Sequence, residues 1–541
     1  MDTHVTHPVT GWTHTVRLLL SCGAIALSSA LIALSAPEIG GQPLWVWLAF
    51  APWLYSLRWL SPLLAALSGL AMGLGYIVPE HWGAFSVAAQ SAGYAGLAQA
   101  ALVIAFFLTY ALPFMLFGGL DRSLQRYTQG ALQPLALLRA GVLTSLVSGF
   151  SQLLSPFPYT PVSAITDSTK LLQLAAIGGE PLLLLLLLWP SALLAGLFGQ
   201  RVHTWRQLAR AVTPLALSFL AVTLYGGWRI DAMDRSDAAG AGVRLSVMPL
   251  QLDLPAYAAS MMLTRDRPGA TISALELSRA GLARAPRTEL VLWPETPLAI
   301  AQSEQVCAIA QQLSDRLGRP LLMHCARALG NQHQYTLELR RPTQAEPMQT
   351  EVVAVHAKSA LVPIYEQPLW GIGPIAPGEA GTVFAFDARR RLIPALCYEL
   401  HARGHIRAGV LAGGNIIVHS ASYTPWNRHP IDLWNQRMAQ LRAVEFGVPI
   451  VSASNRAASG WIDANGRLRS QTARFGRQAE CVDVWSPDSN PTLQTYLQPV
   501  LAWLPMLGIW LVIAVKHWLV RRRQGLVREA FINSAPDKNA T

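Results

Sequence analysis

Charged residues are scarce in this chain. Only 13% of its 541 residues are Asp, Glu, Lys or Arg, while 52% are hydrophobic and the mean hydropathy is +0.31. Soluble domains carry about a quarter charged residues, so this composition excludes an ordinary soluble protein and indicates one that lies largely in a membrane. The net charge of +11 does not indicate nucleic-acid binding, because the sequence contains no basic–aromatic cluster.

Cysteine is rare as well, and its spacing is uninformative about metals. The five cysteines form no CxxC pair and no Cys/His pattern of a metal site, so the sequence predicts neither a metal nor a cofactor. Cys22 lies in an apolar run and is expected in a hydrophobic core. Cys307 and Cys325 would pair only in an oxidising compartment, which the sequence leaves open.

Apolar runs that match the thickness of a bilayer are abundant. A membrane-crossing helix needs about 20 residues. Eight candidate runs lie at residues 16–36, 43–60, 61–79, 95–118, 134–155, 171–199, 211–228 and 498–520. The second is short and rich in Trp, so it is expected to be tilted or partly interfacial. The first is interpreted as a span rather than a signal peptide, because it lacks a small-residue cleavage site and further spans follow it.

The positions of the arginines predict how these spans are oriented. With a cytoplasmic N-terminus, the inside segments contain Arg17, Arg58, Arg122, Arg126, Arg201, Arg206, Arg210 and Arg521–Arg523. The expected outside connections at 37–42, 80–94 and 156–169 contain no Lys or Arg. This alternation follows the positive-inside rule. Seven crossings then place residues 229–497 outside the cytoplasm and the tail 521–541 inside it.

The chain therefore divides into a membrane domain (1–228), an outer domain (229–497), a C-terminal span (498–520) and a tail (521–541). The outer domain alternates short apolar β-type runs with helical patterns near 267–285, 302–317 and 430–446. Asn465-Gly466 indicates a hairpin turn. Several strands are apolar throughout, which predicts an α/β fold whose sheets are covered on both faces.

Two ionisable residues fall within the expected spans. Arg139 lies near a cytoplasmic end, where its side chain can extend to the surface. Glu180 is either a functional intramembrane carboxylate or an interfacial residue beside a helix break at Gly178, Gly179 and Pro181.

Three strand-like runs of the outer domain end in reactive groups. Glu295 ends "ELVLWPE", Lys358 ends "VVAVHAK", and Cys397 follows "RLIPAL". Such a set can perform acyl transfer, with a thiol nucleophile, a carboxylate base and a cation that stabilises the oxyanion. Each residue alone also fits a structural role. Lys358 is nevertheless the only lysine of residues 229–497, in a chain with four lysines among 42 basic residues.

These runs resemble a known family. "LVLWPET", "KSALVPIYE" and "CYE" are similar to the three motif blocks of the nitrilase superfamily. The spans and residues 438–468, "MAQLRAVEFGVPIVSASNRAASGWIDANGRL", resemble the apolipoprotein N-acyltransferase family, as do "PYTP" and "LLQLAAIGGE" in the membrane part. The resemblance implies a multi-span helical membrane bundle plus an α/β nitrilase-type α-β-β-α sandwich, in a bacterial inner membrane with the catalytic domain on the periplasmic side.

The resemblance also implies roles for individual residues. Glu295 would be the general base, Cys397 the nucleophile and Lys358 the oxyanion cation, with Glu366, Tyr398 and Glu399 as supporting residues. The implied reaction moves a fatty acyl chain from a phospholipid to the amine of a diacylglyceryl-cysteine on an apolipoprotein, through a Cys397 thioester. The implied partners are thus a phospholipid donor, an apolipoprotein acceptor and the lipid bilayer, without a cofactor.

Three departures from the family pattern affect substrate recognition. The chain has "IYE" at 364–366 where the family has "FGE", it reads "HSASYTPWNRHP" after the nucleophile, and its segment between Lys358 and Cys397 is short. Two alternatives follow. One is a divergent membrane carbon–nitrogen hydrolase of the conjugal-transfer-associated type, acting on another amide or ester. The other is a catalytically dead scaffold that retains the nitrilase fold.

Overall fold

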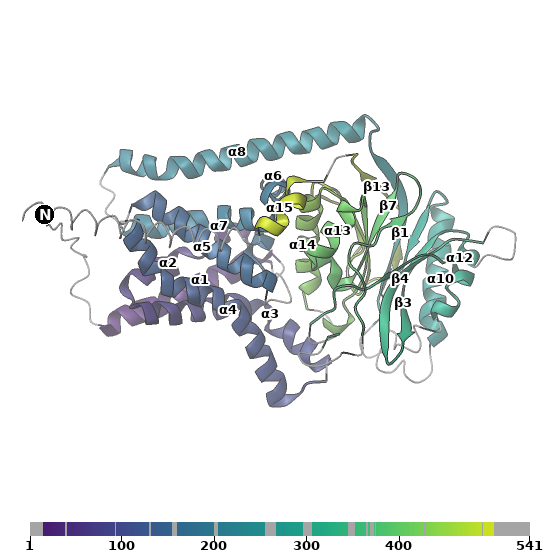
Figure 1. Cartoon of the computed structure of the whole chain (residues 1–541), viewed down its shortest axis with the longest axis horizontal. Helices are drawn as coiled ribbons and strands as arrows, with labels where there is room; N and C mark the ends of the chain where they lie inside the picture. The colour runs from purple at the N-terminus through teal and green to yellow at the C-terminus, as the bar shows by residue number, and fades with distance from the viewer. Residues whose placement is uncertain are drawn as a thin grey trace, which may run out of the picture.

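The computed structural model joins a bundle of long helices to an α/β domain (Figure 1). It describes residues 14–501, apart from 38–39, 92, 129–130, 154–158, 200–203, 255–266, 296–303, 305, 344–351, 364–365, 368–372, 374, 427–428 and 489–490. The expected C-terminal span 498–520 lies outside the described residues beyond residue 501. Its first residues belong to α15 (Leu493–Leu501).

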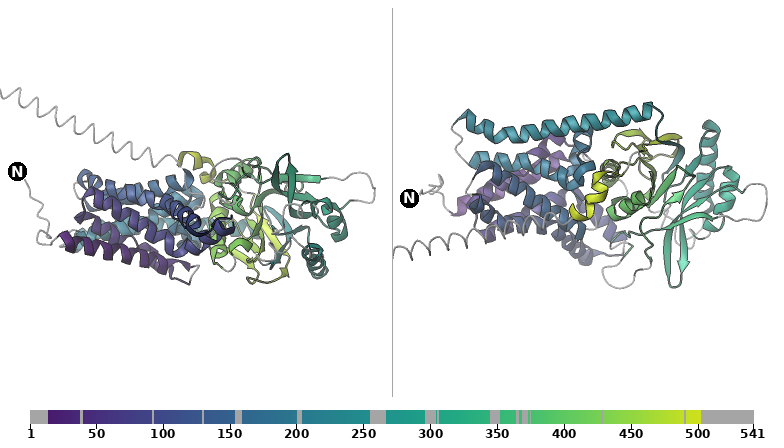
Figure 2. Two further views of the ribbon diagram at one scale, coloured as in Figure 1. Left: turned by 90° about the horizontal axis from the view of Figure 1, so that it is seen from below. Right: turned by 45° about the horizontal axis from the view of Figure 1, so that its top comes forward.

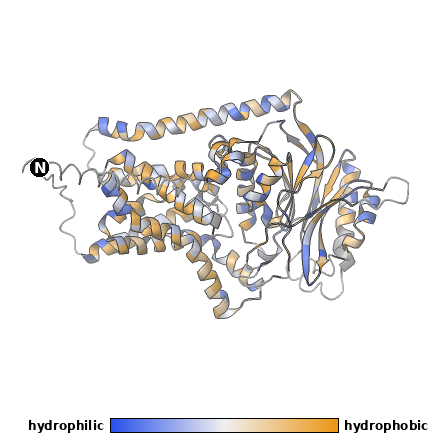
Figure 3. Cartoon of the chain, in the orientation of Figure 1, coloured by the Kyte–Doolittle hydropathy of each residue, from blue (hydrophilic) through white to orange (hydrophobic). Residues whose placement is uncertain are grey.

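Six helices of the described chain are long and apolar enough to cross a membrane. They are α1 (His14–Ser35), α3 (Pro62–Ser91), α4 (Gly96–Tyr127), α5 (Leu132–Leu153), α7 (Ala175–Gly199) and α8 (Trp205–Ala238). Figure 3 shows hydrophobic residues throughout this half of the molecule. The multi-span helical bundle expected from the sequence is confirmed.

The run 43–60 does not form a single spanning helix. It consists of the 3-10 helix η2 (Pro43–Trp47), the six-residue α2 (Ala51–Ser56) and the 3-10 helix η3 (Leu57–Trp59). Proline lies in the first turn of η2 and of α2. Proline fixes φ and lacks an N–H, so it is favoured in the first turn of a helix.

This broken segment still carries the chain across the bundle. Figure 1 shows α1 starting at the end of the bundle remote from the α/β domain. The Arg58 guanidinium donates to the Gly199 carbonyl at 2.7 Å, where α7 ends far from that domain. α3 therefore also starts at the remote end, and its Gly83 approaches His429 of the α/β domain. Because α1 and α3 run in the same direction, the described residues 40–61 return between them.

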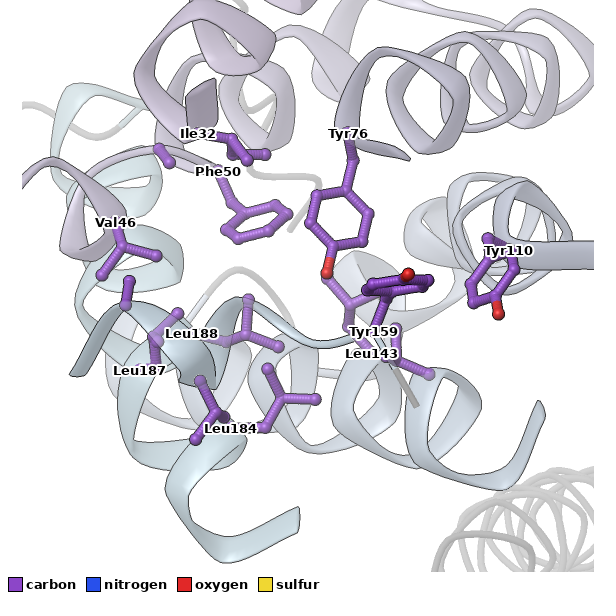
Figure 4. Packing of buried hydrophobic residues seen from close by; sticks show 14 of the residues in the cluster. Ile32, Val46, Phe50, Tyr76, Tyr110, Leu143, Tyr159, Leu184, Leu187 and Leu188 are labelled. Atoms are coloured by element: carbon purple, nitrogen blue, oxygen red, sulfur yellow. The ribbon is translucent and has the colours of Figure 1, made fainter. Parts of the chain in front are cut away.

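The bundle has one continuous apolar core. Figure 4 shows Phe50, Tyr76, Leu143 and Tyr159 converging from different segments. Arg139 does not extend to the surface as expected, because its guanidinium makes two hydrogen bonds to Asp121 of α4, at 2.7 and 2.8 Å. Both side chains are buried, and the carboxylate compensates the charge of Arg139.

Helix α8 continues ten residues beyond the expected domain boundary at 228. The apolar run ends there, but the polar segment that follows stays helical to Ala238. Arg229 hydrogen-bonds to Gln173, and Asp234 accepts a hydrogen bond from Arg467 Nη1 at 2.9 Å. These contacts to polar partners stabilise a helix that projects past the apolar run, which hydropathy alone does not predict.

The α/β domain contains thirteen strands among the described residues. The strands are β1 (Val243–Leu252), β2 (Leu290–Leu292), β3 (Leu321–Leu329), β4 (Gln332–Arg340), β5 (Val352–Ala357), β6 (Phe384–Ala385), β7 (Arg391–Leu396), β8 (Ile416–Ser422), β9 (Ile450–Asn455), β10 (Gly460–Ile462), β11 (Leu468–Gln471), β12 (Gln478–Ala479) and β13 (Val482–Ser486). Their order is β5-β4-β3-β2-β1-β9-β8-β7-β6, with the remaining strands off this path. The three expected runs that end in Glu295, Lys358 and Cys397 form β2, β5 and β7.

The strands form two sheet halves that share the end of β1. The β1–β5 half and the β6–β9 half face each other across one apolar core. The outer face of the first is covered by α10 (Arg267–Arg284) and α12 (Ala310–Leu317). The outer face of the second is covered by α13 (Arg403–Leu411) and α14 (Ile431–Phe446). Figure 2 shows these layers from two further sides. The expected α-β-β-α sandwich is thereby confirmed.

A disulfide joins Cys307 and Cys325, which the sequence left open, across a separation of 18 residues. It ties the segment before α12 to β3. Cys22, Cys397 and Cys481 carry free thiols.

We expect the double substitution Cys307→Ala/Cys325→Ala to lower the free energy of unfolding of the α/β domain by about 3 kcal/mol, since a loop of this length then gains entropy in the unfolded state. Thermal unfolding in detergent measures the effect. Cys481→Ala is the matched control, because it removes a free thiol that packs against the same core. An equal loss of stability in the control would contradict the role of the disulfide.

Candidate active site

The three reactive residues lie at strand ends that point the same way. β1, β2 and β3 are parallel, and β5 regains their direction through the antiparallel β4. β9, β8 and β7 are parallel to β1. Glu295, Lys358 and Cys397 follow β2, β5 and β7, and carboxyl ends of parallel strands share one edge. The sheet topology therefore brings together residues that are about a hundred positions apart.

Cys397 begins the 3-10 helix η5 (Cys397–His401) directly after β7. Its φ is +52°, in the left-handed region that a side chain disfavours. Its carbonyl accepts a hydrogen bond from His419 Nε2 at 3.1 Å. Burial lowers the pKa of His419 to about 4, so this imidazole is neutral and its Nδ1 accepts from Ser452. The strained turn thus has a specific partner that holds it.

Glu295 lies beside the thiol. Its carboxylate hydrogen-bonds to Cys397 and accepts the Ser422 N–H at 3.1 Å. Burial raises the pKa of Glu295 to about 7, and Glu366 adds to the rise while Lys358 opposes it. Burial and the charge of Glu295 also raise the pKa of the Cys397 thiol well above its usual value. A carboxylate with this pKa can take and return a proton near neutral pH.

Lys358 is completely buried and paired with Glu366. Its Nζ donates to Glu366 Oε1 at 2.6 Å, and Glu366 Oε2 accepts the Val362 N–H at 2.7 Å. Burial alone would lower the pKa of Lys358, but the carboxylates of Glu366 and Glu295 raise it above its ordinary value. Lys358 therefore remains an ammonium group, and it is close enough to Cys397 to shift the pKa of the thiol.

Glu399 does not point at the reacting atoms. Its carboxylate accepts from the Leu396 N–H (2.8 Å), the Ser359 N–H (2.6 Å), the Ser359 hydroxyl (2.7 Å) and His356 Nε2 (2.9 Å). Burial alone would raise the pKa of Glu399, but the hydrogen bond and charge of His356 dominate with the other donors and lower it to about 2. Glu399 thus joins the ends of β5 and β7.

Tyr398 faces the membrane bundle. Its ring lies 6.0 Å from that of His401 between centroids, and burial raises the pKa of its phenol. Tyr398 and Cys397 both pack against the apolar cluster that fills the bundle. The side chain next to the thiol therefore borders the part of the molecule that is suited to lipid.

Polar residues that the sequence did not single out complete the site. They are His356, Ser359, His405, His419 and Ser422. His419 and Ser422 are the fourth and the last residue of β8, a strand that is buried along its whole length. The sequence did contain one signal for His356 and His419, since each is a histidine within an apolar strand run. A buried imidazole needs hydrogen-bond partners, so such a residue indicates a polar network nearby.

His356, Glu399 and His405 are close enough to hold a metal ion, with ligand atoms within 4.8 Å of one another. Each imidazole nitrogen already has a partner, however. His356 contacts Thr382 and Glu399, and His405 contacts Ser359 and the Pro394 carbonyl at 2.8 Å. The cluster is therefore satisfied as a hydrogen-bond network that supports the end of β7.

The pKa of Glu399 predicts how stability depends on pH. The group is ionised more readily in the folded state, with a pKa of about 2 against an ordinary 4.5. Its contribution, ~3 kcal/mol, is therefore full above about pH 5 and is lost as the pH falls through 4.5 toward 2. Unfolding measured over this range should show a flatter profile in Glu399→Gln. Glu276→Gln, on the exposed face of α10, is the control and should follow wild type.

The pKa of Glu295 predicts how thiol reactivity depends on pH. The carboxyl group is neutral below about pH 7 and becomes a base above it. Alkylation of Cys397 by iodoacetamide should therefore rise through pH 7, in a chain whose Cys22 and Cys481 are replaced by Ala. We expect Glu295→Gln to slow alkylation by ~100-fold or more, since the proton acceptor is lost. An identical pH profile in this variant would contradict the assignment.

Curated relatives of this chain share one name. The apolipoprotein N-acyltransferase of Azotobacter vinelandii is 28% identical over 508 residues, which covers 86% of this chain and 89% of the relative. That of Pseudomonas putida is 26% identical and covers 87% of this chain and 90% of the relative. That of Allorhizobium ampelinum is 27% identical over 199 residues. No family model matches the chain.

Solved structures similar to this chain cover about half of its length. Nit3 of Saccharomyces cerevisiae, a member of branch 10 of the nitrilase superfamily, covers 48% of this chain and 95% of its own, with 16% identity and a TM-score of 0.38. An amidase of Nesterenkonia covers 46% of this chain and 91% of its own, with 19% identity and a TM-score of 0.34.

The full-length relatives match both the helical bundle and the α/β domain. They support an N-acyltransferase. The resemblance to the apolipoprotein N-acyltransferase family, indicated by the motifs, is thus confirmed over most of the chain.

Proposed function

We propose that this chain moves a fatty acyl chain from a phospholipid to the α-amine of the N-terminal diacylglyceryl-cysteine of an apolipoprotein. One observation carries the proposal: Cys397 contacts Glu295 on the side of the α/β domain and packs against the apolar cluster of the membrane bundle on the other. A nucleophile at this boundary suits an ester whose acyl chain is in the bilayer.

In the first half-reaction Glu295 takes the Cys397 proton, and the thiolate attacks the acyl ester carbonyl. Lys358 Nζ and the backbone N–H of Tyr398 stabilise the oxyanion. The C–O bond to the glycerol then breaks, and the leaving alkoxide takes the proton from Glu295. The products are a thioester on Cys397 and a lysophospholipid.

In the second half-reaction the amine of the acceptor attacks the thioester carbonyl, and Glu295 accepts the amine proton. The C–S bond breaks, an amide forms, and the thiolate regains the proton from Glu295. A group that alternates between base and acid requires a pKa near the working pH, which fits the value of about 7 for Glu295.

In this proposal the bundle crosses the bacterial inner membrane, with the α/β domain in the periplasm. Six long helices and the broken segment 40–61 give seven crossings, which places the domain opposite a cytoplasmic N-terminus. The Cys307–Cys325 disulfide supports an oxidising compartment. The arginine distribution supports the same orientation.

Incubation with acyl-labelled phospholipid should leave a hydroxylamine-sensitive label on the wild-type chain and none on Cys397→Ala. The thioester proposal predicts this because hydroxylamine cleaves thioesters and the variant lacks the sulfur. Cys481→Ala is the control and should retain the label. Absence of any adduct with all phospholipid donors would overturn the lipid-donor assignment.

The acceptor is tested separately. Addition of a diacylglyceryl-cysteine peptide should discharge the label from the enzyme onto the peptide amine, and an N-acetylated peptide should not accept it. Release of free fatty acid with both peptides would favour the carbon–nitrogen hydrolase alternative. Rescue of a strain depleted of its own N-acyltransferase would test the function in the cell.

A further inference from the structure

Four charged residues, of which Arg403 is partly exposed and the other three are buried, lie where the membrane bundle meets the α/β domain. Glu180 of α7 pairs with Arg403, which starts α13, and Arg442 of α14 pairs with Glu445 of the same helix. Arg403 also lies 3.8 Å from Glu445. We call these residues the interface ion cluster. Its charges balance, with two carboxylates and two guanidinium groups.

The break in α7 creates one of these contacts. Gly178 and Gly179 have non-helical backbone angles, and φ of Gly179 is +62°. The helix restarts at Glu180, so its N–H has no carbonyl partner from a preceding turn. Glu445 Oε1 accepts this N–H at 2.8 Å. A carboxylate at the start of a helix segment is also favoured by the helix dipole.

Glu180 lies beside the expected helix break and is buried. It is 2% exposed, and its partner comes from the α/β domain, 223 positions later in the chain. Arg403 is at the first turn of α13, where the helix dipole disfavours a cation. The carboxylates of Glu180 and Glu445 compensate for this placement.

Arg403 is connected to the nucleophile by a short, rigid segment. η5 runs from Cys397 to His401, and Ala402 alone separates it from Arg403. The Ala402 N–H donates to the Glu399 carbonyl at 3.0 Å, and the His405 N–H donates to the Ala402 carbonyl at 2.9 Å. A displacement of Arg403 therefore moves the backbone that orients the thiol.

A second contact from the bundle reaches the same segment. The His401 ring lies 5.2 Å from that of Trp434, which lies 4.4 Å from Tyr159. Tyr159 in turn lies 3.7 Å from His81 of α3. His81 and Tyr159 thus reach His401 of η5 through the ring of Trp434. Glu180 contacts Arg403, which follows η5 in the chain after Ala402.

We propose that Glu180 and Arg403 are positioning residues for Cys397, so that the reactivity of the thiol depends on an intramembrane carboxylate of α7. The proposal rests on the proposed role of Cys397 as the nucleophile. The bundle then has a second task besides membrane attachment: it sets the geometry of the catalytic turn.

The test is the alkylation rate of Cys397 by iodoacetamide in the full chain, in nanodiscs, with Cys22 and Cys481 replaced by Ala. Glu180→Gln removes the charge and keeps the size. We expect about a tenfold or larger decrease in rate, because a displacement of roughly 1 Å at a reacting group can cost up to ~100-fold. Glu180→Asp keeps the charge and should restore part of the rate.

Asp121→Asn is the matched control. It also leaves a buried arginine, Arg139, without its carboxylate partner. Arg139 lies within the bundle and away from η5. We expect a lower unfolding temperature in both variants, and a slower alkylation in Glu180→Gln alone. Equal alkylation rates in wild type and Glu180→Gln would overturn the proposal.

Two further outcomes are informative. If Glu180→Gln does not fold, the alkylation rate of Cys397 in Glu180→Asp decides. An altered unfolding temperature of this variant would show that the contact to Arg403 has changed. A wild-type alkylation rate in the same variant would then overturn the proposal. The alkylation assay needs no lipid. Absence of an acyl adduct on wild type would therefore refute the proposed function, whereas an adduct with unchanged alkylation in the variants would refute only the positioning role.

Discussion

The arrangement of the site depends on one buried carboxylate. Glu399 accepts hydrogen bonds from Leu396, at the end of β7, and from Ser359, directly after β5. These strands belong to opposite halves of the sandwich, whose shared core is apolar. Apolar packing holds sheets together without fixing their relative register, whereas charge-assisted hydrogen bonds have narrow geometry. The carboxylate therefore fixes Cys397 relative to Lys358, which are the neighbours of its two partners in sequence.

Four ionisable groups near one thiol would serve no purpose if they titrated together. Their surroundings separate them. Glu399 has four donors and a pKa of about 2, so it stays charged and structural. Glu366 compensates Lys358 at 2.6 Å, which keeps the ammonium buried and charged. Glu295 has fewer donors, and burial moves its pKa to about 7. The pKa values of Glu399 and Glu295 are pushed apart in this way, so the two carboxylates have different tasks, and Glu295 is suited to exchange protons.

The sequence predicted the parts that depend on local pattern. The strands ending in Glu295, Lys358 and Cys397 were recognisable in the sequence. A buried strand consists almost entirely of apolar residues, so a reactive residue at its end stands out. Two features depended on partners far along the chain and were not predictable. Glu399 joins the ends of β5 and β7 only because the fold brings these strands close together. Glu180 pairs with Arg403, which lies 223 positions later in the chain. No local sequence pattern reveals either contact. The broken run at 43–60 is intermediate: its hydropathy suits a span, but the chain forms two 3-10 helices and the short α2, and Pro52 lies in the first turn of α2.

The membrane bundle and the α/β domain share one apolar core where they meet. The apolar cluster of the bundle continues into Tyr423, Trp426, Ile431 and Trp434 of the α/β domain. A charged site at the end of an open sheet would ordinarily face water, and an acyl ester would have to leave the bilayer to reach it. Here Cys397 borders the continuous cluster, while Glu295 and Lys358 reach it from the polar side. In the proposed reaction only the ester carbonyl needs to enter the charged region, so the acyl chain keeps its apolar surroundings throughout the transfer.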